Sequence, residues 1–158
     1  MPSDFDRKMM LKAIELSRKN IEKGGGPFGA IIVRDGQIVA RAGNSVTISN
    51  DPTAHAEINA IRKACRKLGT FDLSGCTIYT SCEPCPMCLG AIYWAHIDKI
   101  FYGNDAKAAA AAGFDDNFIY KELSLLPEYR SIPTEPLHGD DAFKVFEIWI
   151  NKPDKTRY

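Results

Sequence analysis

Residues 82–88 read Cys-Glu-Pro-Cys-Pro-Met-Cys, between an apolar strand-like run and an apolar helix-like run. Pro84 suits the first turn of a helix, because proline has no N–H to lose there, so a helix is predicted from about residue 84 to residue 94. Cys85 and Cys88 are three residues apart and would share one face of it. The free N–H groups and the dipole at a helix start favour thiolates over thiols. Two thiolates so placed predict a site for a soft or borderline cation, with zinc the first choice.

A histidine and a glutamate lie upstream, in the run Pro-Thr-Ala-His-Ala-Glu at residues 52–57. Together with Cys85 and Cys88, His55 would give three protein ligands and one open position, which is the pattern of catalytic zinc sites. An H-x-E followed by P-C-x-x-C is the signature of zinc-dependent nucleobase deaminases, in which the glutamate carries protons and binds no metal. Glu57 is therefore the predicted general acid/base. His55 and Glu57 can converge only in the first turn of a helix, because residues two apart in mid-helix point in different directions.

Cys82 leaves a second arrangement of the metal site open. It also lies three residues from Cys85, so that His55 and three cysteines could form a closed Cys₃His structural site. Two observations oppose this reading. Cys82 stands at the end of a predicted strand, before Pro84 turns the chain, and a closed site would leave Glu57 without a purpose.

Alternating strand and helix patterns predict an α/β fold. Strands are expected over residues 30–34, 37–42, 76–81 and 97–102, and helices over residues 4–23, 53–67, 84–94, 105–112 and 140–151. The Asp-Gly pair at 35–36 is a two-residue hairpin signal. The proline-interrupted run SIPTEPL at 131–137 can form only an edge strand or an extended segment. The expected architecture is one domain, 1–158, folded as a three-layer α/β/α sandwich with a central mixed five-stranded sheet.

Composition and charge narrow the class of protein. The chain is 45% hydrophobic and 25% charged, as is ordinary for a soluble globular domain. Its formal net charge of zero argues against a protein that grips a nucleic-acid backbone. Five cysteines without a signal peptide indicate reduced thiols in the cytoplasm. No apolar run approaches the ~20 residues of a membrane span, so no membrane partner is expected.

Several stretches carry a family resemblance that covers nearly the full chain. DPTAHAEINAIRKAC at 51–65 and TSCEPCPMCLGAIYWA at 80–95 resemble the cytidine deaminase superfamily. GGPFGAIIVRDG at 25–36, AGFDDNFIYKE at 112–122 and the C-terminal Tyr158 are similar to its bacterial guanine deaminases. The resemblance implies a hydrolase of purine catabolism that converts guanine to xanthine and ammonia with one Zn²⁺ per chain. It also implies a homodimer with exchanged C-terminal segments.

The resemblance further implies a set of substrate contacts. It brings Phe28 near the purine ring, Asn44 to the polar edge of the purine, and Asp116 to the substrate as a second catalytic carboxylate. It adds Ala54 and Tyr158 as substrate-binding residues. The residues alone leave other interpretations open: Phe28 as a core aromatic, Asn44 as a turn residue, Asp116 as a helix cap and the tail as a frayed end.

Three functions remain compatible with these patterns. The first is a guanine deaminase. The second is another member of the superfamily, above all a tRNA adenosine deaminase, which DPTAHAEI, EPCPMC and DAKAAAAAG also resemble. The third is a non-enzymatic zinc module. The neutral charge and GFDDNFIY at 113–120 favour the first over the second, and Glu57 favours either enzyme over the third.

Overall fold

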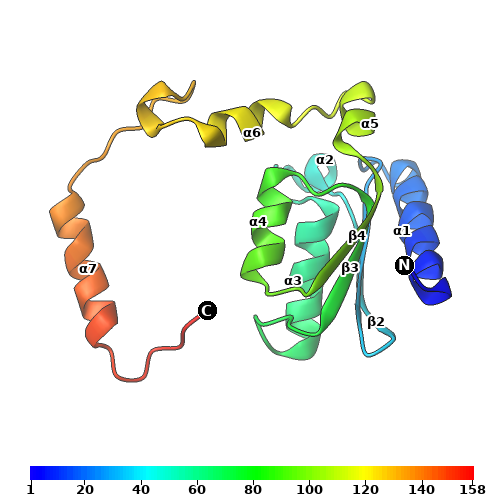
Figure 1. Cartoon of the computed structure of the whole chain (residues 1–158), viewed down its shortest axis with the longest axis horizontal. Helices are drawn as coiled ribbons and strands as arrows, with labels where there is room; N and C mark the ends of the chain where they lie inside the picture. The colour runs from blue at the N-terminus through cyan, green and yellow to red at the C-terminus, as the bar shows by residue number, and fades with distance from the viewer. The chain divides into compact units, whose positions relative to one another are not determined.

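The computed structural model describes residues 1–158, which divide into two units, 1–116 and 117–158 (Figure 1). The first unit contains α1 (Asp4–Glu22), β1 (Gly29–Arg34), β2 (Gln37–Gly43), α2 (Val46–Ser49), α3 (Ala56–Leu68), β3 (Cys76–Cys82), α4 (Pro86–Trp94), β4 (Lys99–Asn104) and α5 (Ala106–Ala111). The second contains α6 (Asn117–Ser124), a 3₁₀ turn (Pro127–Tyr129) and α7 (Gly139–Asn151).

The sheet of the first unit is mixed and has the strand order β2-β1-β3-β4. β1 pairs antiparallel with β2 and with β3, whereas β3 and β4 are parallel. The predicted α/β fold with a mixed sheet is confirmed, but the expected number of strands is wrong, because the sheet has four strands and not five. Residues 131–137 form no strand. Pro133 and Pro136 interrupt that run and have no N–H to donate to a ladder, so it is the extended alternative that forms.

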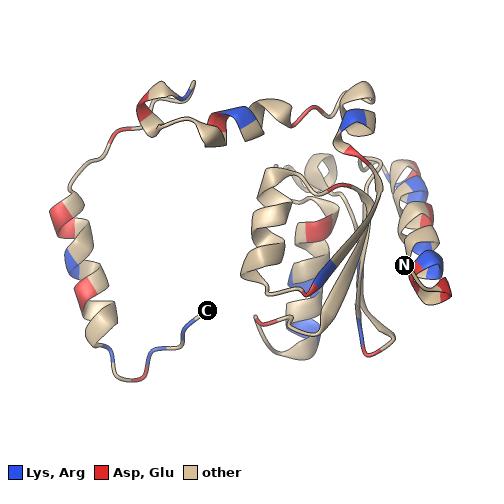
Figure 2. Cartoon of the chain, in the orientation of Figure 1, with Lys and Arg blue, Asp and Glu red and all other residues tan.

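One face of the sheet is covered by α1 (Figure 1). Ser3 caps this helix in a reciprocal capping box with Asp6, which explains why the helix begins at the predicted residue. Its buried stripe packs on side chains of β1 and β3 in a cluster of Met9, Ala13, Ile31, Val33 and Tyr79. Figure 2 shows acidic and basic residues interspersed along α1, where Arg18 pairs with glutamates on either side.

The opposite face of the sheet is covered by α3 and α4. The core there is built from small side chains on α3, which let the helix approach the sheet closely, and from aliphatic side chains on the strands and α4; it includes Ala56, Ala60, Ala64, Ile32, Ile78 and Ile92. The sheet thus lies between two helical layers. This arrangement directs the first turns of α3 and α4 towards one end of β3.

Both of these helices begin later than the sequence predicts. The side chain of Asp51 accepts the N–H of Thr53 at 2.8 Å, which makes a turn where a helix was expected, and α3 starts at Ala56. In α4 the first helical position is taken by Pro86 and not by Pro84. Either proline satisfies the local rule for a helix start, so local sequence could not choose between them.

The second unit contains no buried residue. Ser131 is held against α6 by two hydrogen bonds, from its N–H and its hydroxyl, to the carboxylate of Glu122 at 2.8 and 2.9 Å. The predicted last helix is present as α7, one residue longer at its start than expected. No helix of the chain has both the length and the apolar character needed to cross a bilayer.

Candidate metal centre and active site

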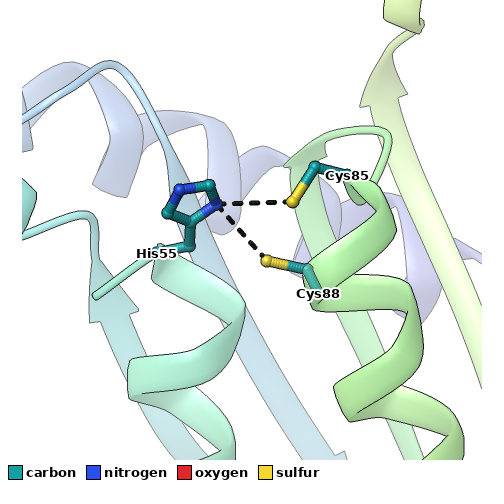
Figure 3. A group of neighbouring side chains, drawn as sticks. All are labelled: His55, Cys85 and Cys88. Atoms are coloured by element: carbon teal, nitrogen blue, oxygen red, sulfur yellow. Dashed lines mark hydrogen bonds between the residues drawn. The ribbon is translucent and has the colours of Figure 1, made fainter. Parts of the chain in front are cut away.

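Three side chains meet where α3 and α4 begin (Figure 3). The Nδ1 atom of His55 lies 3.5 Å from the sulfur of Cys85 and 3.5 Å from the sulfur of Cys88. One ligand atom from each of the three residues lies within 4.8 Å of the other two. An imidazole nitrogen and two thiol sulfurs are the donors that zinc prefers. The structure therefore brings together the three predicted ligands in a group that can hold a metal ion.

The helix starts explain this convergence. His55 and Cys85 are the residues immediately before α3 and α4, and both have extended backbones, with φ/ψ of −68°/158° and −65°/169°. A side chain in that position turns back across the first turn of its helix. Cys88, the third residue of α4, therefore lies beside Cys85, although only one of the two is helical. The positive ends of both helices point at the same group and favour thiolates there.

The two thiols differ in their ionisation. The thiol of Cys88 and the ring of His55 lower the pKa of Cys85 to about 4, against the opposing effect of burial. The pKa of Cys88 is raised, because it bonds to Cys85 and because it is buried. The bond to Cys85 also raises the pKa of His55. One thiolate is thus already present near neutral pH, which prepares the group for a cation.

Glu57 is the second residue of α3 and is only 7% exposed. The thiol of Cys88 donates to its Oε2 atom at 3.4 Å. Burial raises the pKa of the Glu57 carboxyl, and the bond from Cys88 partly opposes that rise. The predicted convergence of His55 and Glu57 in a first helical turn is therefore observed, with the carboxyl directly beside a predicted metal ligand.

Cys82 does not belong to the three-residue group. It is the last residue of β3, and its backbone carbonyl accepts the hydroxyl of Thr80 at 2.6 Å. Burial, reinforced by the charge of Glu57, raises the pKa of the Cys82 thiol to about 11. The group that the structure brings together is therefore the open one of three ligands, without Cys82.

Three of the predicted substrate residues lie on neighbouring segments. Asn44 is 8% exposed, its backbone N–H donates to the carbonyl of Phe28 at 3.2 Å, and its Oδ1 accepts the N–H of Val46 at 3.1 Å. The Phe28 ring packs against the core and meets the ring of Phe114 edge-on, with centroids 4.8 Å apart. Ala54, directly before His55, is buried. The turn and core interpretations of Asn44 and Phe28 therefore hold as structural roles, whatever they bind.

Asp116 follows the turn that contains Phe114, and partial burial raises the pKa of its carboxyl. The negative charge of Cys85 adds to that rise, so Asp116 lies within electrostatic reach of the candidate metal group. Tyr158 belongs to the second unit and is 74% exposed. Its substrate contact stays a prediction.

The sequence analysis missed two buried or half-buried asparagines, Asn20 on α1 and Asn59 on α3. The side chain of Asn20 donates to the backbone carbonyl of Asn44, and that of Asn59 donates to the carbonyl of Gly43. A polar residue on the inward face of an amphipathic helix was the signal that could have found them, because such a group must find a hydrogen-bond partner.

Comparison with known proteins identifies the family. A family model, the cytidine and deoxycytidylate deaminase zinc-binding region, matches residues 3–104. The chain is 52% identical over 148 residues to a guanine deaminase of Bacillus subtilis (strain 168), covering 93% of this chain and 95% of that protein. The X-ray structure of guanine deaminase from B. subtilis superposes with a TM-score of 0.94 at 50% identity, over 96% of this chain and 98% of that one.

A relative with a different name matches a shorter part of the chain. A tRNA-specific adenosine deaminase of Aquifex aeolicus is 47% identical over 90 residues, which is 57% of this chain and 60% of that protein. Of these two relatives, only the guanine deaminase matches nearly the whole length of the chain. The family model spans His55, Cys85 and Cys88 as well as the entire sheet, and the chain therefore belongs to the cytidine and deoxycytidylate deaminase family.

Proposed function

We propose that this protein is a guanine deaminase, a hydrolase that converts guanine to xanthine and ammonia in purine catabolism. The observation that carries the proposal is the near full-length similarity, in sequence and in structure, to a guanine deaminase. That similarity covers 93% of the chain, whereas the tRNA-specific adenosine deaminase of Aquifex aeolicus matches 57% of it. The substrate is therefore a small purine base.

We infer that His55, Cys85 and Cys88 hold one zinc ion per chain. The donor set and the closeness of the three ligand atoms support this assignment. Bound zinc supplies Lewis-acid activation of a water molecule by lowering its pKa. Three protein ligands would leave one coordination position for that water, which is the pattern of catalytic zinc sites.

Glu57 is proposed to carry the first proton. It would take a proton from the attacking water and return it to a ring nitrogen of guanine. Its burial supports the role, because burial raises the pKa of the Glu57 carboxyl and so makes it a better proton acceptor than an exposed glutamate. Its contact with Cys88, a proposed zinc ligand, would place it close to a water bound by that zinc.

Four further residues are proposed to hold the base. Asn44 would bind the polar edge of guanine, and Phe28 and Ala54 would pack against its ring. Asp116 would accept hydrogen bonds from the 2-amino group and deliver the second proton that the departing ammonia needs. The raised pKa of Asp116 supports that donor role. Two carboxylates would thus divide two proton transfers.

The active protein is proposed to be a homodimer in which C-terminal segments are exchanged, so that Tyr158 reaches a purine pocket. Residues 117–158 bury no side chain, although α7 carries Phe143, Phe146 and Ile150 at helical spacing. An apolar face of this size on a short helix indicates a surface that another protein surface covers. A second copy of the chain is the partner that the family resemblance favours.

A cytoplasmic location is proposed from the cysteines. All five are free in the structure. Thiolate metal ligands must stay reduced, and the cytoplasm keeps thiols in that state.

Zinc content and turnover measured on one preparation test the proposal. The purified protein should contain one zinc per chain and convert guanine to xanthine. Removal of the metal with a chelator should abolish xanthine formation, and added zinc should restore it. Undiminished turnover in the metal-free protein would refute the proposed chemistry.

A further inference from the structure

The backbone on both sides of Asn44 is held by two asparagine side chains. The first is Asn20, near the end of α1 and only 7% exposed. Its Nδ2 atom donates to the carbonyl of Gly26 at 2.7 Å and to the carbonyl of Asn44 at 2.8 Å. One buried amide therefore ties the loop before β1 to the end of β2. Asn44, one proposed base contact, is itself bonded in this way, and Phe28, another, lies two residues after Gly26.

The second is Asn59, on α3. Its Nδ2 atom lies 3.0 Å from the carbonyl of Gly43, 3.0 Å from the hydroxyl of Ser45 and 3.2 Å from the carbonyl of Ala54. The backbone N–H of Asn59 donates to the carbonyl of His55 at 2.9 Å. Asn59 thus links the residues that flank Asn44 to the helix start that carries a metal ligand. It fixes the position of Asn44 relative to His55.

The side chain of Asn20 is tightly packed against the backbone of two glycines. A Cβ atom on Gly43 would lie 2.1 Å from Oδ1 of Asn20, and one on Gly25 would lie 2.3 Å from Nδ2 of Asn20 and 2.4 Å from the carbonyl oxygen of Asn44. Only glycine fits at these two positions while Asn20 keeps its place. The side-chain amide of Asn20 is therefore packed between the backbone at Gly25 and the backbone at Gly43, and a shift of this amide would also move Asn44.

The side chain of Asn44 is oriented as well. Because its Oδ1 accepts the N–H of Val46, its Nδ2 atom is the part that can donate to a ligand. A donor at this place selects a purine with an acceptor on the facing edge. The 6-carbonyl of guanine is such an acceptor, whereas the 6-amino group of adenine is a donor.

We propose that Asn20 and Asn59 are positioning residues for purine selection. They hold the backbone of Asn44 from opposite faces of the sheet, one from α1 and one from α3, so that its amide meets the 6-carbonyl while C2 of the base faces the metal. The inference rests on the proposed function, but it concerns recognition of the 6-carbonyl and not turnover. It can therefore be tested by binding alone.

The test compares two ligands that are not deaminated at C2, hypoxanthine and unsubstituted purine, on the zinc-loaded protein. The ratio of their dissociation constants measures what the 6-carbonyl contributes together with the N1–H that accompanies it. A polar site rejects analogues that lack its partner group, so hypoxanthine should bind wild type at least ~10-fold more tightly. In Asn20→Leu and in Asn59→Leu the ratio should fall towards one, as in Asn44→Leu. The double variant Asn59→Leu/Asn44→Leu should show no further fall, because both changes remove the same interaction.

Controls separate positioning from general loss of stability. Tyr79→Phe removes a partly buried hydrogen bond to Asp6, away from Asn44, so it should lower stability and leave the ratio unchanged. Asn20→Asp and Asn59→Asp keep the shape of the side chain and lose its donors, and they replace either Leu variant that fails to fold. A wild-type ratio in the folded, zinc-loaded variants would overturn the inference. Failure of wild type to convert guanine, with the ratio falling in the variants, would instead refute the proposed function alone.

Discussion

Glu57 is the residue proposed to carry the first proton. Glu57→Gln keeps the size of the side chain but cannot relay a proton, so zinc content and melting temperature should be unchanged while kcat falls about 10²–10⁴-fold. Glu83→Gln is the matched control. The carboxylate of Glu83 accepts the N–H of Ala106 at 3.0 Å, and a glutamine oxygen can accept the same bond, so turnover should persist. A kcat near wild type in Glu57→Gln would remove Glu57 from the mechanism.

Substitution of Asp116 distinguishes between two roles for this residue, a catalytic carboxylate and a helix cap. Asparagine caps a helix as well as aspartate does, so Asp116→Asn should keep the fold and the zinc. It cannot donate the second proton, and guanine turnover should fall by about 10²-fold or more. Steady-state kinetics with zinc analysis of the same sample make the comparison. Full activity in this variant would leave Asp116 with a capping role only.

The sequence predicted that His55, Cys85 and Cys88 come together, but it did not predict the asparagine contacts. His55, Glu57, Cys85 and Cys88 sit in two short motifs, and each motif has a local geometry at a helix start. Asn20 meets Asn44, and Asn59 meets Gly43, only after two helices have packed on opposite faces of the sheet. Such contacts depend on tertiary packing, which cannot be predicted from short sequence motifs.

The packing of α1 on the sheet includes one ionisable contact. The hydroxyl of Tyr79 donates to Asp6 at 2.6 Å, and this bond, with those from Ser3, lowers the pKa of Asp6 to about 2. The folded-state pKa lies below the unfolded value of about 3.9. The resulting stabilisation is therefore present above pH ~4 and is lost as the pH falls through ~2.

Removal of that contact should change the acid side of the stability profile. In Tyr79→Phe the pKa of Asp6 should move back towards its ordinary value, so that stability at neutral pH falls and the loss between pH 4 and pH 2 becomes shallower. Urea unfolding at several pH values measures both effects. An identical pH dependence in wild type and variant would show that the bond from Tyr79 does not stabilise the ionised carboxylate.

The elements themselves were predicted more reliably than their ends. The hairpin at Asp35-Gly36 and the capped start of α1 follow from local chemistry and are present. Both α3 and α4 start later than predicted. A turn at Asp51 replaces the expected first residues of α3, and Pro86 takes the first position of α4 in place of Pro84. Local sequence rules allow either outcome in each case.

For the whole molecule, removal of the C-terminal tail tests the proposed exchange of C-terminal segments between subunits. The core clusters draw only on residues 9–101, so removal of the residues from Lys155 onward should leave the fold of the first unit intact. It should raise KM or lower kcat for guanine, because Tyr158 is lost. Steady-state kinetics and thermal melts of the truncated protein measure the two effects.

A shorter deletion supplies the control for that truncation. The ammonium group of Lys155 donates to the carbonyl of Ile150 at 2.7 Å and so caps α7. Deletion of residues 156–158 keeps this cap and removes Tyr158, so it should reproduce the kinetic defect. Unchanged kinetics in both truncated proteins would show that the tail is a frayed end.

The strand count also belongs to the whole molecule. The prediction of five strands was wrong because residues 131–137 were compatible with an edge strand only if a sheet edge lay beside them. Their two prolines made the extended form equally consistent with the sequence. Whether residues 131–137 form an edge strand or an extended segment depends on the arrangement of the complete chain. The pattern of seven residues alone cannot predict it.

Ammonia release from a panel of guanine, adenine, adenosine, cytidine and tRNA, assayed under one set of conditions, tests the assignment of substrate most directly. Guanine should be converted to xanthine, with kcat/KM at least ~10⁴-fold above that of every other substrate, because a site built to hydrogen-bond one edge rejects bases that lack it. Efficient deamination of adenosine in tRNA with none of guanine would contradict it.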